Sequence, residues 1–314
     1  MSTLMANLEN PIENKMTIRR KYTMCAKAFL LLIFCLLLTQ QIASRLPNLG
    51  EPQIYLVTPM YKTFTGLNPE IVSNLERSEE SLMIYVITPT YKRPEQIPEL
   101  TRLSHTLRLV KNITWLVIDD AESKSSVVEK LLNKSGIRYE YMLAPMPNEF
   151  RSNKKYLPRG VSNRNKGITW IRNNAKTGII YFADDDNTYD LKLFEEIRKT
   201  KKISMFPVGL VTHLGLSTPI VKNCTFIGFY DGYYAGRKYP VDFAGFAISV
   251  EFLLKSPNAT IPFKAGYEED LFLKRLLPFS FGDIELLASC CTEILVWHTQ
   301  TKKNHPTRKT TMIK

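Results

Sequence analysis

Short apolar runs alternate with amphipathic stretches from residue 83 onward. The runs are rich in β-branched and aromatic side chains, and they predict strands at residues 84–88, 115–118, 138–143 and 179–182. Apolar positions after the first run recur at helical spacing, at Ile97, Leu100, Leu103 and Leu107. Residues 125–132 predict a second helix. Strands separated by helices favour a mainly parallel sheet, so the sequence predicts an α/β fold.

The strand predicted at 179–182 is followed by three adjacent carboxylates, Asp184, Asp185 and Asp186. Like charges at this spacing repel one another, so they are tolerated in water or around a cation. The carboxyl ends of parallel strands are also where open α/β sheets bind ligands. By itself, the segment fits an acidic surface turn as well as it fits a cation site.

A long polar loop and a less regular second half complete the pattern. Residues 144–160 are rich in Pro, Asn and Lys and predict a loop of the kind that covers ligands. Ser162 is a candidate cap for the helix that follows. Later in the chain, a helix is predicted at 191–199 and strands at 207–211, 225–229, 241–250 and 294–297.

The N-terminus carries a membrane-directed pattern. Basic residues in the tail, 1–27, precede an apolar run at 28–38 that extends with mildly polar residues to 43. The run is shorter than the roughly 20 apolar residues that span a bilayer, so a cleaved signal peptide is the alternative. Because Thr39, Gln40 and Gln41 make a poor cleavage site, we expect an uncleaved signal anchor at 28–43. Positive charges stay cytosolic, so the body of this single-pass type II protein would be luminal.

The predicted stem, residues 44–82, contains a near copy of the first strand. Residues 54–62 read IYLVTPMYK, and residues 84–92 read IYVITPTYK. The spacing between the copies is tight for a full βαβ crossover with its own helix. We expect the second copy to occupy the sheet, because it continues into Arg93 and a predicted helix.

Composition and charge narrow the choice of partners only slightly. The 314 residues can bury a core, and 44% of them are hydrophobic. The net charge of +12 indicates an anionic partner, which could be nucleic acid, anionic lipid, a nucleotide or an acidic glycan. The basic clusters are short and typical of solvated faces, and a luminal body excludes nucleic acid as a partner.

Cysteines and glycosylation motifs agree with a luminal body. Cys25 and Cys35 lie within or beside the anchor, which leaves Cys224, Cys290 and Cys291 for one pair and one free or intermolecular thiol. A homodimer is compatible with this number of cysteines. The motifs for N-glycosylation are at Asn112, Asn133, Asn223 and Asn258.

The carboxylate triplet suits chemistry on a nucleoside-diphosphate sugar. The diphosphate leaving group concentrates negative charge, and a divalent cation held by carboxylate oxygens neutralises it as the glycosidic bond breaks. Oxygen ligands suit Mg²⁺ or Mn²⁺. One or two Asp side chains suffice when phosphate oxygens and water complete the coordination.

Six segments, all in order along the chain, extend this interpretation. They read YVITPTYKR at 85–93, WLVIDDAE at 115–122, PRGVSNRNK at 158–166, YFADDDNTY at 181–189, VDFAGFA at 241–247 and VWHT at 296–299. Together they resemble the animal β1,3-glucuronosyltransferases. The resemblance implies a glycosyltransferase A fold, in which a Rossmann-like UDP-sugar-binding half, residues 83–189, merges with an acceptor-binding half, residues 190–314. It also implies UDP-glucuronic acid as donor, Mn²⁺ as cofactor, inversion at the anomeric carbon and a galactose-terminated acceptor on a proteoglycan linker or glycoprotein.

The same resemblance implies roles for donor-side residues. Asp186 would bind the metal directly, with Asp184 and Asp185 on the ribose and the donor sugar. The positions that match the family's other donor contacts are Tyr91 (stacked on uracil), Asp120 (hydrogen-bonded to uracil), Arg159, Arg164 and His298 (on the diphosphate).

Inversion by direct displacement needs a base that takes the proton of the attacking hydroxyl. Residues 266–271 read GYEEDL, and register with the family places this base at Glu269, while its neighbour Glu268 would be solvated. The implied acceptor contacts are Arg237 and Asp242, with Tyr233 standing where the family carries an aromatic platform.

Two departures from the family pattern keep alternatives open. Ser217 stands where better-known members have a Glu that touches the acceptor, and Gln300 stands where they have an Arg. The loss of such a contact costs ~1–3 kcal/mol, although Arg164 is a candidate for compensation. The alternatives are the same fold acting on another UDP-sugar or acceptor, and a catalytically idle glycan-binding paralogue. The expected location is the Golgi membrane, with the catalytic part in the lumen.

Deletion of residues 51–80 tests the interpretation of the duplicated strand. We expect the shortened protein to fold and to keep its activity, because residues 84–92 supply the strand. Circular dichroism and a transfer assay measure the two properties. A shortened protein that does not fold would show that the first copy is part of the structure.

Overall fold

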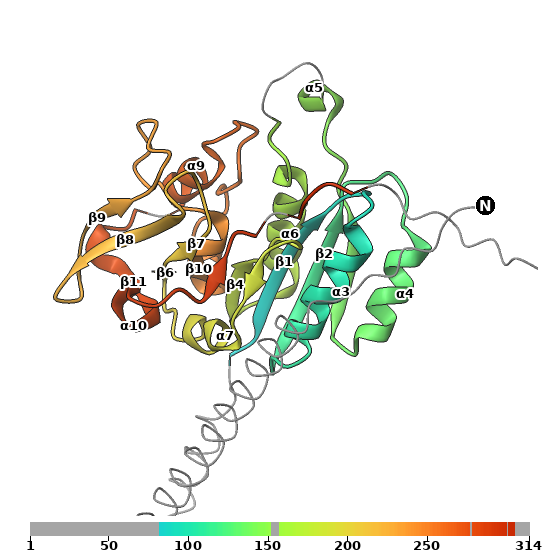
Figure 1. Cartoon of the computed structure of the whole chain (residues 1–314), viewed down its shortest axis with the longest axis horizontal. Coiled ribbons are helices and arrows are strands. Elements are labelled where there is room, and N and C mark those ends of the chain that lie inside the picture. Colours follow the sequence, from blue (N-terminus) through green and yellow to red (C-terminus); the bar gives the residue numbers. More distant parts are fainter. Residues whose placement is uncertain (1–81, 152–156, 277, 300, 305–314) are drawn as a thin grey trace, which may run out of the picture. The chain divides into compact units, whose positions relative to one another are not determined.

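The computed structural model describes residues 82–151, 157–276, 278–299 and 301–304 (Figure 1). All of them belong to one compact unit, Asn68–Lys314, whereas the other unit, Met1–Leu67, contains none of them. The predicted cytosolic tail, the signal anchor and the stem up to residue 81, with the first strand copy, therefore lie outside the described residues. Within the described ranges, no helix combines the length and the apolar character needed to cross a bilayer.

The described residues form a seven-stranded sheet in the order β11-β6-β10-β4-β1-β2-β3. Its strands are β1 (Ile84–Thr90), β2 (Ile113–Asp119), β3 (Tyr139–Leu143), β4 (Ile179–Phe182), β6 (Ile203–Met205), β10 (Phe246–Ser249) and β11 (Ile284–Leu286). β1 runs parallel to β2 and β4, β2 runs parallel to β3, and β6 runs parallel to β11. β10 lies antiparallel between β4 and β6. The predicted α/β fold with a mainly parallel sheet is confirmed.

Two hydrophobic clusters cover the two faces of this sheet. Ile84 and Val86 of β1 pack in the cluster that contains α3 (Gln96–Leu107) and α4 (Ser126–Ser135). Ile87 packs in the other cluster with α6 (Val161–Asn174). Figure 1 shows α3 and α4 on the face of β1 and β2 turned toward the viewer. All residues of β2 and β4 are buried, as expected for parallel strands covered on both sides.

A second, five-stranded sheet within the described residues has the order β5-β12-β7-β8-β9. Its strands are β5 (Thr188–Tyr189), β7 (Val208–Gly209), β8 (Leu216–Lys222), β9 (Thr225–Tyr230) and β12 (Val296–Trp297). The remaining helices are α5 (Asn148–Arg151), α7 (Leu191–Ile197), α8 (Val250–Leu254), α9 (Glu268–Arg275) and α10 (Leu287–Cys291), with 3-10 turns at Phe243–Gly245 and Phe281–Asp283.

Local predictions differ from the structure at several positions, three of which have a clear physical reason. α6 begins at Val161 after Gly160, whose φ of 75° only glycine adopts easily, so Ser162 lies inside the helix and does not cap it. The strand predicted at 241–250 is shorter, because the side chain of Asp242 accepts a hydrogen bond from the amide of Ala244 and holds a 3-10 turn before β10. β8 was not predicted, because Ser, Thr and Pro interrupt its apolar pattern.

Two of the three described cysteines form a disulfide, as the sequence analysis allowed. Cys224, in the turn between β8 and β9, forms a disulfide with Cys290 of α10, with Cα atoms 5.3 Å apart. Among the described cysteines, Cys291 is the one outside a disulfide. Burial raises the pKa of the Cys291 thiol to about 12, so it is a poor nucleophile. The disulfide therefore fastens the β8–β9 hairpin to α10.

Replacing single cysteines distinguishes the disulfide-bonded Cys224 from Cys291, which is outside the disulfide. Cys224→Ser should lower the free energy of unfolding by about 2–4 kcal/mol, because it opens a long covalent loop. Cys291→Ser is the matched control and should have a smaller effect. Urea unfolding of both variants, with and without a reducing agent, measures the difference. Equal destabilisation by both substitutions would contradict the assignment.

Candidate functional site

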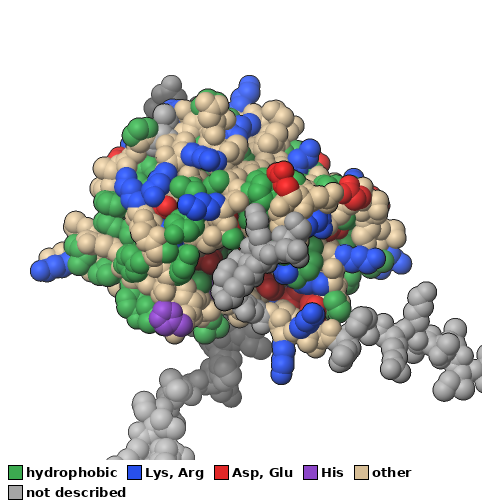
Figure 2. All heavy atoms as spheres, turned by 90° about the horizontal axis from the view of Figure 1, so that it is seen from above, with side chains coloured by type: hydrophobic (Ala, Val, Ile, Leu, Met, Phe, Trp, Pro, Cys, Tyr) green, Lys and Arg blue, Asp and Glu red, His purple; other side chains and the backbone are tan. Residues whose placement is uncertain are grey.

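The carboxyl ends of three neighbouring parallel strands form one rim. Tyr91 follows β1, Asp120 follows β2, and the triplet from Asp184 to Asp186 follows β4 by way of Ala183. A cavity of about 450 Å³ lies against this rim. Figure 2 shows a hollow on this face, where red carboxylate side chains are visible among blue Lys and Arg side chains.

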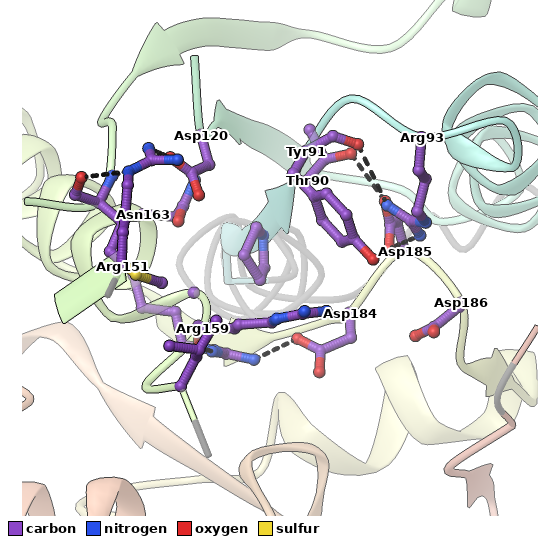
Figure 3. Close-up of a pocket in the computed structure, with 15 residues that line it drawn as sticks. Thr90, Tyr91, Arg93, Asp120, Arg151, Arg159, Asn163, Asp184, Asp185 and Asp186 are labelled. Carbon is purple, nitrogen blue, oxygen red and sulfur yellow. Dashed lines mark hydrogen bonds and ion pairs between the residues drawn. The ribbon is translucent and has the colours of Figure 1, made fainter. Parts of the chain in front are cut away.

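The first cavity brings together seven of the residues predicted for the donor side. The residues that line it are Pro89, Thr90, Tyr91, Arg93, Asp120, Met146, Arg151, Leu157, Arg159, Gly160, Asn163, Arg164, Asp184, Asp185 and Asp186. Figure 3 shows Tyr91 in the middle of this group, with Arg159 and Asp184 on one side of it and Arg93 and Asp185 on another. Four arginines among the lining residues make the cavity suitable for an anion.

Two carboxylates of the triplet are already partnered. Asp185 is 5% exposed and accepts hydrogen bonds from Thr90 Oγ1 and from Arg93 Nη2, each at 2.7 Å. Burial raises the pKa of Asp185, although Arg93 opposes this effect. Asp184 forms an ion pair with Arg164.

Asp186 is the carboxylate left for an external cation. Within the described residues, its side chain has neither a hydrogen bond nor an ion pair, and in Figure 3 it lies apart from the dashed contacts. Partial burial, together with the charges of Asp184 and Asp185, raises the pKa of Asp186 to about 6. Arg102 and Thr299 both donate hydrogen bonds to its backbone oxygen, which fixes the position of the residue.

Arg164 is held at the centre of the site by its surroundings. Its side chain is 7% exposed, and its guanidinium lies 4.3 Å from the ring centre of Phe243. Gly160 has a φ of 75°, and a Cβ there would force this guanidinium to shift from its position. Arg159 lies farther out, 5.6 Å from the ring centre of Tyr91.

A second cavity, of about 270 Å³, adjoins the first. Arg159, Arg164 and Asp184 line both cavities. The other residues that line the second cavity are Val211, Thr212, Asp231, Tyr233, Arg237, Val241, Asp242, Phe243, Gly266, Glu268, Glu269 and His298. The second cavity is therefore lined by the predicted base, the predicted acceptor-side residues and His298.

The acidic start of α9 provides a carboxylate with an unusual pKa. Burial, followed by the charges of Asp242 and Glu268, raises the pKa of Glu269 to about 8. Glu268 was expected to be solvated, but it is half-buried and lines the same cavity, and burial raises its pKa. Asp270 is 1% exposed and accepts hydrogen bonds from the amides of Lys238 and Tyr239. Asp270 thus anchors the neighbouring loop to α9.

His298 and Asp242 form a partly buried ion pair beside these carboxylates. His298 Nδ1 lies 3.3 Å from Asp242 Oδ2. The Asp242 carboxylate raises the pKa of His298 to about 9, so the imidazole carries a proton and a positive charge at neutral pH. Burial favours the neutral form of Asp242, but His298, the amide of Ala244 and the charge of Arg164 together outweigh burial and lower the pKa of Asp242.

Several lining residues were not predicted from the sequence. Arg93 belongs to the segment 85–93, but no role was predicted for it. Its ion pair with Asp185 joins segments that are far apart in the chain. Arg151 of α5 forms an ion pair with Asp120 at 2.5 Å, and nothing in the 144–160 segment indicated this contact. Asp231 lines the second cavity and is paired with Arg237.

Other predicted positions lie away from the cavities. The four glycosylation motifs have exposed asparagines at Asn112, Asn133, Asn223 and Asn258. Ser217 is 2% exposed in β8 and lines neither cavity. Gln300 lies outside the described residues.

Comparisons with known proteins agree on one family. The sequence matches the profile of Glycosyltransferase family 43 over residues 103–302. It is 56% identical over 223 residues to galactosylgalactosylxylosylprotein 3-beta-glucuronosyltransferase P of Drosophila melanogaster, covering 71% of this chain and 47% of that protein. It is 40% identical over 228 residues to galactosylgalactosylxylosylprotein 3-beta-glucuronosyltransferase 2 of Homo sapiens, covering 70% and 69%.

The chain spans about half the length of the two Drosophila relatives, since the match covers 54% of galactosylgalactosylxylosylprotein 3-beta-glucuronosyltransferase S. Among solved structures, residues 1–349 of S. aureus TarS match with a TM-score of 0.44 and 15% identity. That match covers 69% of this chain and 60% of the TarS chain, and it is too distant to assign a function.

Glu269→Gln should change how stability depends on pH. Folding raises the pKa of Glu269 from an ordinary value of 4.5 to about 8, so the folded state binds a proton more tightly than the unfolded state. The resulting stabilisation is complete below about pH 4.5 and is lost as pH rises through about 8. The Gln variant lacks this titration, so its Tm should increase relative to the parent's as pH rises.

Calorimetric melting between about pH 5 and about pH 9 measures this difference. Glu122→Gln, at an exposed loop position, is the control and should run parallel to the parent. A constant Tm difference between the Glu269→Gln variant and the parent would contradict the raised pKa.

Proposed function

The chain belongs to glycosyltransferase family 43, and we propose that it transfers glucuronic acid from UDP-glucuronic acid to a galactose-terminated glycan. The new bond would be a β1,3 linkage formed with inversion, on a proteoglycan linker or a glycoprotein. The observation that carries this proposal is the shared wall of the two cavities. Arg159, Arg164 and Asp184 line both, so a donor in one and an acceptor in the other would meet there.

The first cavity supports donor binding. In this proposal uracil stacks on Tyr91 and hydrogen-bonds to Asp120 at the ends of β1 and β2. Arg159 and Arg164 face the diphosphate across the start of α6, where backbone N–H groups also favour anions. Asp184 and Asp185 serve the ribose and the donor sugar. Since both already hold an arginine, their partners place these carboxylates before the donor arrives.

The carboxylate oxygens of Asp186 suit a hard divalent cation, and we assign Mn²⁺ to this position. The Asp186 carboxylate faces the first cavity, and burial, followed by repulsion from Asp184 and Asp185, raises its pKa. A bound cation would relieve this repulsion. No cluster of three or more His, Cys, Asp or Glu side chains that could hold a metal occurs in the described residues. The diphosphate and water would therefore supply the other ligands. When bound, the ion would neutralise negative charge on the departing UDP.

Glu269 supplies the base in this proposal. Its carboxylate accepts the proton of the acceptor's 3-hydroxyl as that oxygen attacks the anomeric carbon, while UDP leaves from the opposite face. Protonated His298 lines the second cavity with Glu269, and Arg164 lines both cavities, so both would stabilise the negative charge of the diphosphate. Attack opposite to the leaving group inverts the anomeric centre. Asp242 keeps His298 charged and oriented.

We also propose a Golgi membrane location with the catalytic part in the lumen. The support is the basic and apolar pattern of residues 1–43 and the exposure of all four glycosylation motifs. Association into a homodimer stays a prediction from the sequence.

Substitutions at the two ends of the site separate binding from transfer. Asp186→Ala should abolish the Mn²⁺-dependent binding of UDP, because it removes the free carboxylate. Glu269→Gln should spare UDP binding but lower transfer by about 10²–10⁴-fold, because it removes the base. Calorimetry with UDP and product analysis with UDP-glucuronic acid and Galβ1,3-Gal or lactosamine measure the two effects.

A transfer assay with a panel of UDP-sugars and acceptors tests the identity of the donor and of the acceptor. Preference for UDP-glucose or UDP-xylose would replace the proposed donor. UDP binding without any transfer by the parent would instead identify a glycan-binding paralogue without activity.

A further inference from the structure

The second sheet ends in an edge strand that carries no charge. β9 is the last strand in the order β5-β12-β7-β8-β9, and its six residues read TFIGFY. Neither a charged residue nor a proline is among them. In Figure 1, β9 lies on the outer side of β8. A strand of this composition at the edge of a sheet is a template on which another chain can add a strand.

The outward face of the β8–β9 hairpin adds apolar surface to this edge. Ile220 of β8 is 39% exposed, and Ile227 and Tyr230 of β9 are 59% and 41% exposed. Ile227 is left out of the pairing where the register with β8 shifts, so a bulge interrupts the edge but does not cover it. A Cβ on Gly228 would meet only Ile220, at 4.0 Å, so the backbone there is open to a close approach.

The opposite face of the hairpin is packed, so the hairpin itself is held firmly. The ring of Phe226 stacks on Phe281 with 4.8 Å between the ring centres, and Phe229 is buried. The disulfide between Cys224 and Cys290 fastens the turn of the hairpin to α10. The exposed face and the edge of β9 are therefore stable features of the described part of the chain.

The turn that leads into β9 carries one of the glycosylation motifs, Asn223-Cys224-Thr225. Asn223 and Cys224 have φ angles of 50° and 59° and lie between the paired residues Lys222 and Thr225, which is the geometry of a two-residue hairpin turn. The Asn223 side chain is exposed. The motif therefore places a modifiable amide at one end of the open edge.

We propose that an N-linked oligosaccharide on Asn223 covers β9 and prevents this strand from pairing with other chains. The Asn223 amide nitrogen forms a bond to the anomeric carbon of the oligosaccharide, the bond from that carbon to its lipid-diphosphate carrier breaks, and the amide releases one proton. A glycan is bulky and solubilising, so it protects this edge as charged residues and prolines protect others. The inference rests on the proposed luminal location, where this modification takes place.

The test uses the full chain, produced in animal cells and purified in detergent. Thr225→Ala removes the motif but keeps Asn223, whereas Thr225→Ser keeps a motif and is the matched control. Glycopeptide mass spectrometry should find Asn223 modified in the parent and in Thr225→Ser. On warming, light scattering should detect several-fold more aggregate in Thr225→Ala than in the other two proteins. Equal aggregation of all three would overturn the proposal.

A second substitution shows whether the aggregate forms through β9. Ile227→Lys places a charge on the open edge, so it should return Thr225→Ala to the aggregation level of the parent. If Thr225→Ala does not fold, the parent and Ile227→Lys are compared after enzymatic removal of their glycans. The parent should then aggregate several-fold more than the Lys variant, and equal aggregation of the two would overturn the proposal.

The same measurements separate this inference from the proposed function. Glycans on Asn112, Asn133 or Asn258 with an unmodified Asn223 would support the luminal location but overturn the inference. The absence of glycans from all four sites would contradict both. Thr225 and Asn223 line neither cavity, so Thr225→Ala should transfer glucuronic acid at the rate of the parent. A parent that is modified at Asn223 but transfers nothing would contradict the proposed activity alone.

Discussion

Mutual repulsion among three consecutive carboxylates is the constraint on which the rest of the site depends. The structure resolves it by giving each carboxylate a different environment. Arg164 pairs with Asp184, while Thr90 and Arg93 bind Asp185 in the interior. Asp186 stays unpaired among the described side chains and faces the cavity with a raised pKa. The triplet therefore comprises one buried carboxylate paired with Arg93, one carboxylate paired with Arg164, and one carboxylate without an ion pair among the described residues.

Arg164 connects this arrangement with the opposite side of the site. It contacts Asp184 and the ring of Phe243, and it lines both cavities. Gly160 leaves space for it, and α6 holds it through the packing of that helix on β1 and β2. A change of position of Arg164 would affect donor and acceptor groups together. The partly buried pair of His298 and Asp242 lines the second cavity with this arginine. Glu269, whose pKa is raised, lines the same cavity.

Local patterns in the sequence were sufficient for the parallel core and for the acidic residues at its rim, whereas the other site residues were predicted from the family resemblance. Continuous apolar runs predicted β1, β2 and β4, and the acidic residues after them predicted the rim where Tyr91, Asp120 and the triplet meet. Contacts between distant segments could not be predicted in this way. Asp185 is internal because Arg93 lies beside it in space, and Glu268 is half-buried because α9 packs against the second cavity. The helix start at Val161 depends on the backbone angle of Gly160, which no side-chain pattern reports.

We propose that Glu269, which lines the second cavity, is the base of a glucuronic acid transfer. This is tested by measuring kcat/KM for the acceptor as a function of pH, at saturating UDP-glucuronic acid and Mn²⁺. If Glu269 is the base, the rate rises with pH and levels off above about 8, because only the ionised Glu269 accepts the proton. A rate that does not change between about pH 6 and about pH 9 would show that Glu269 is not the base.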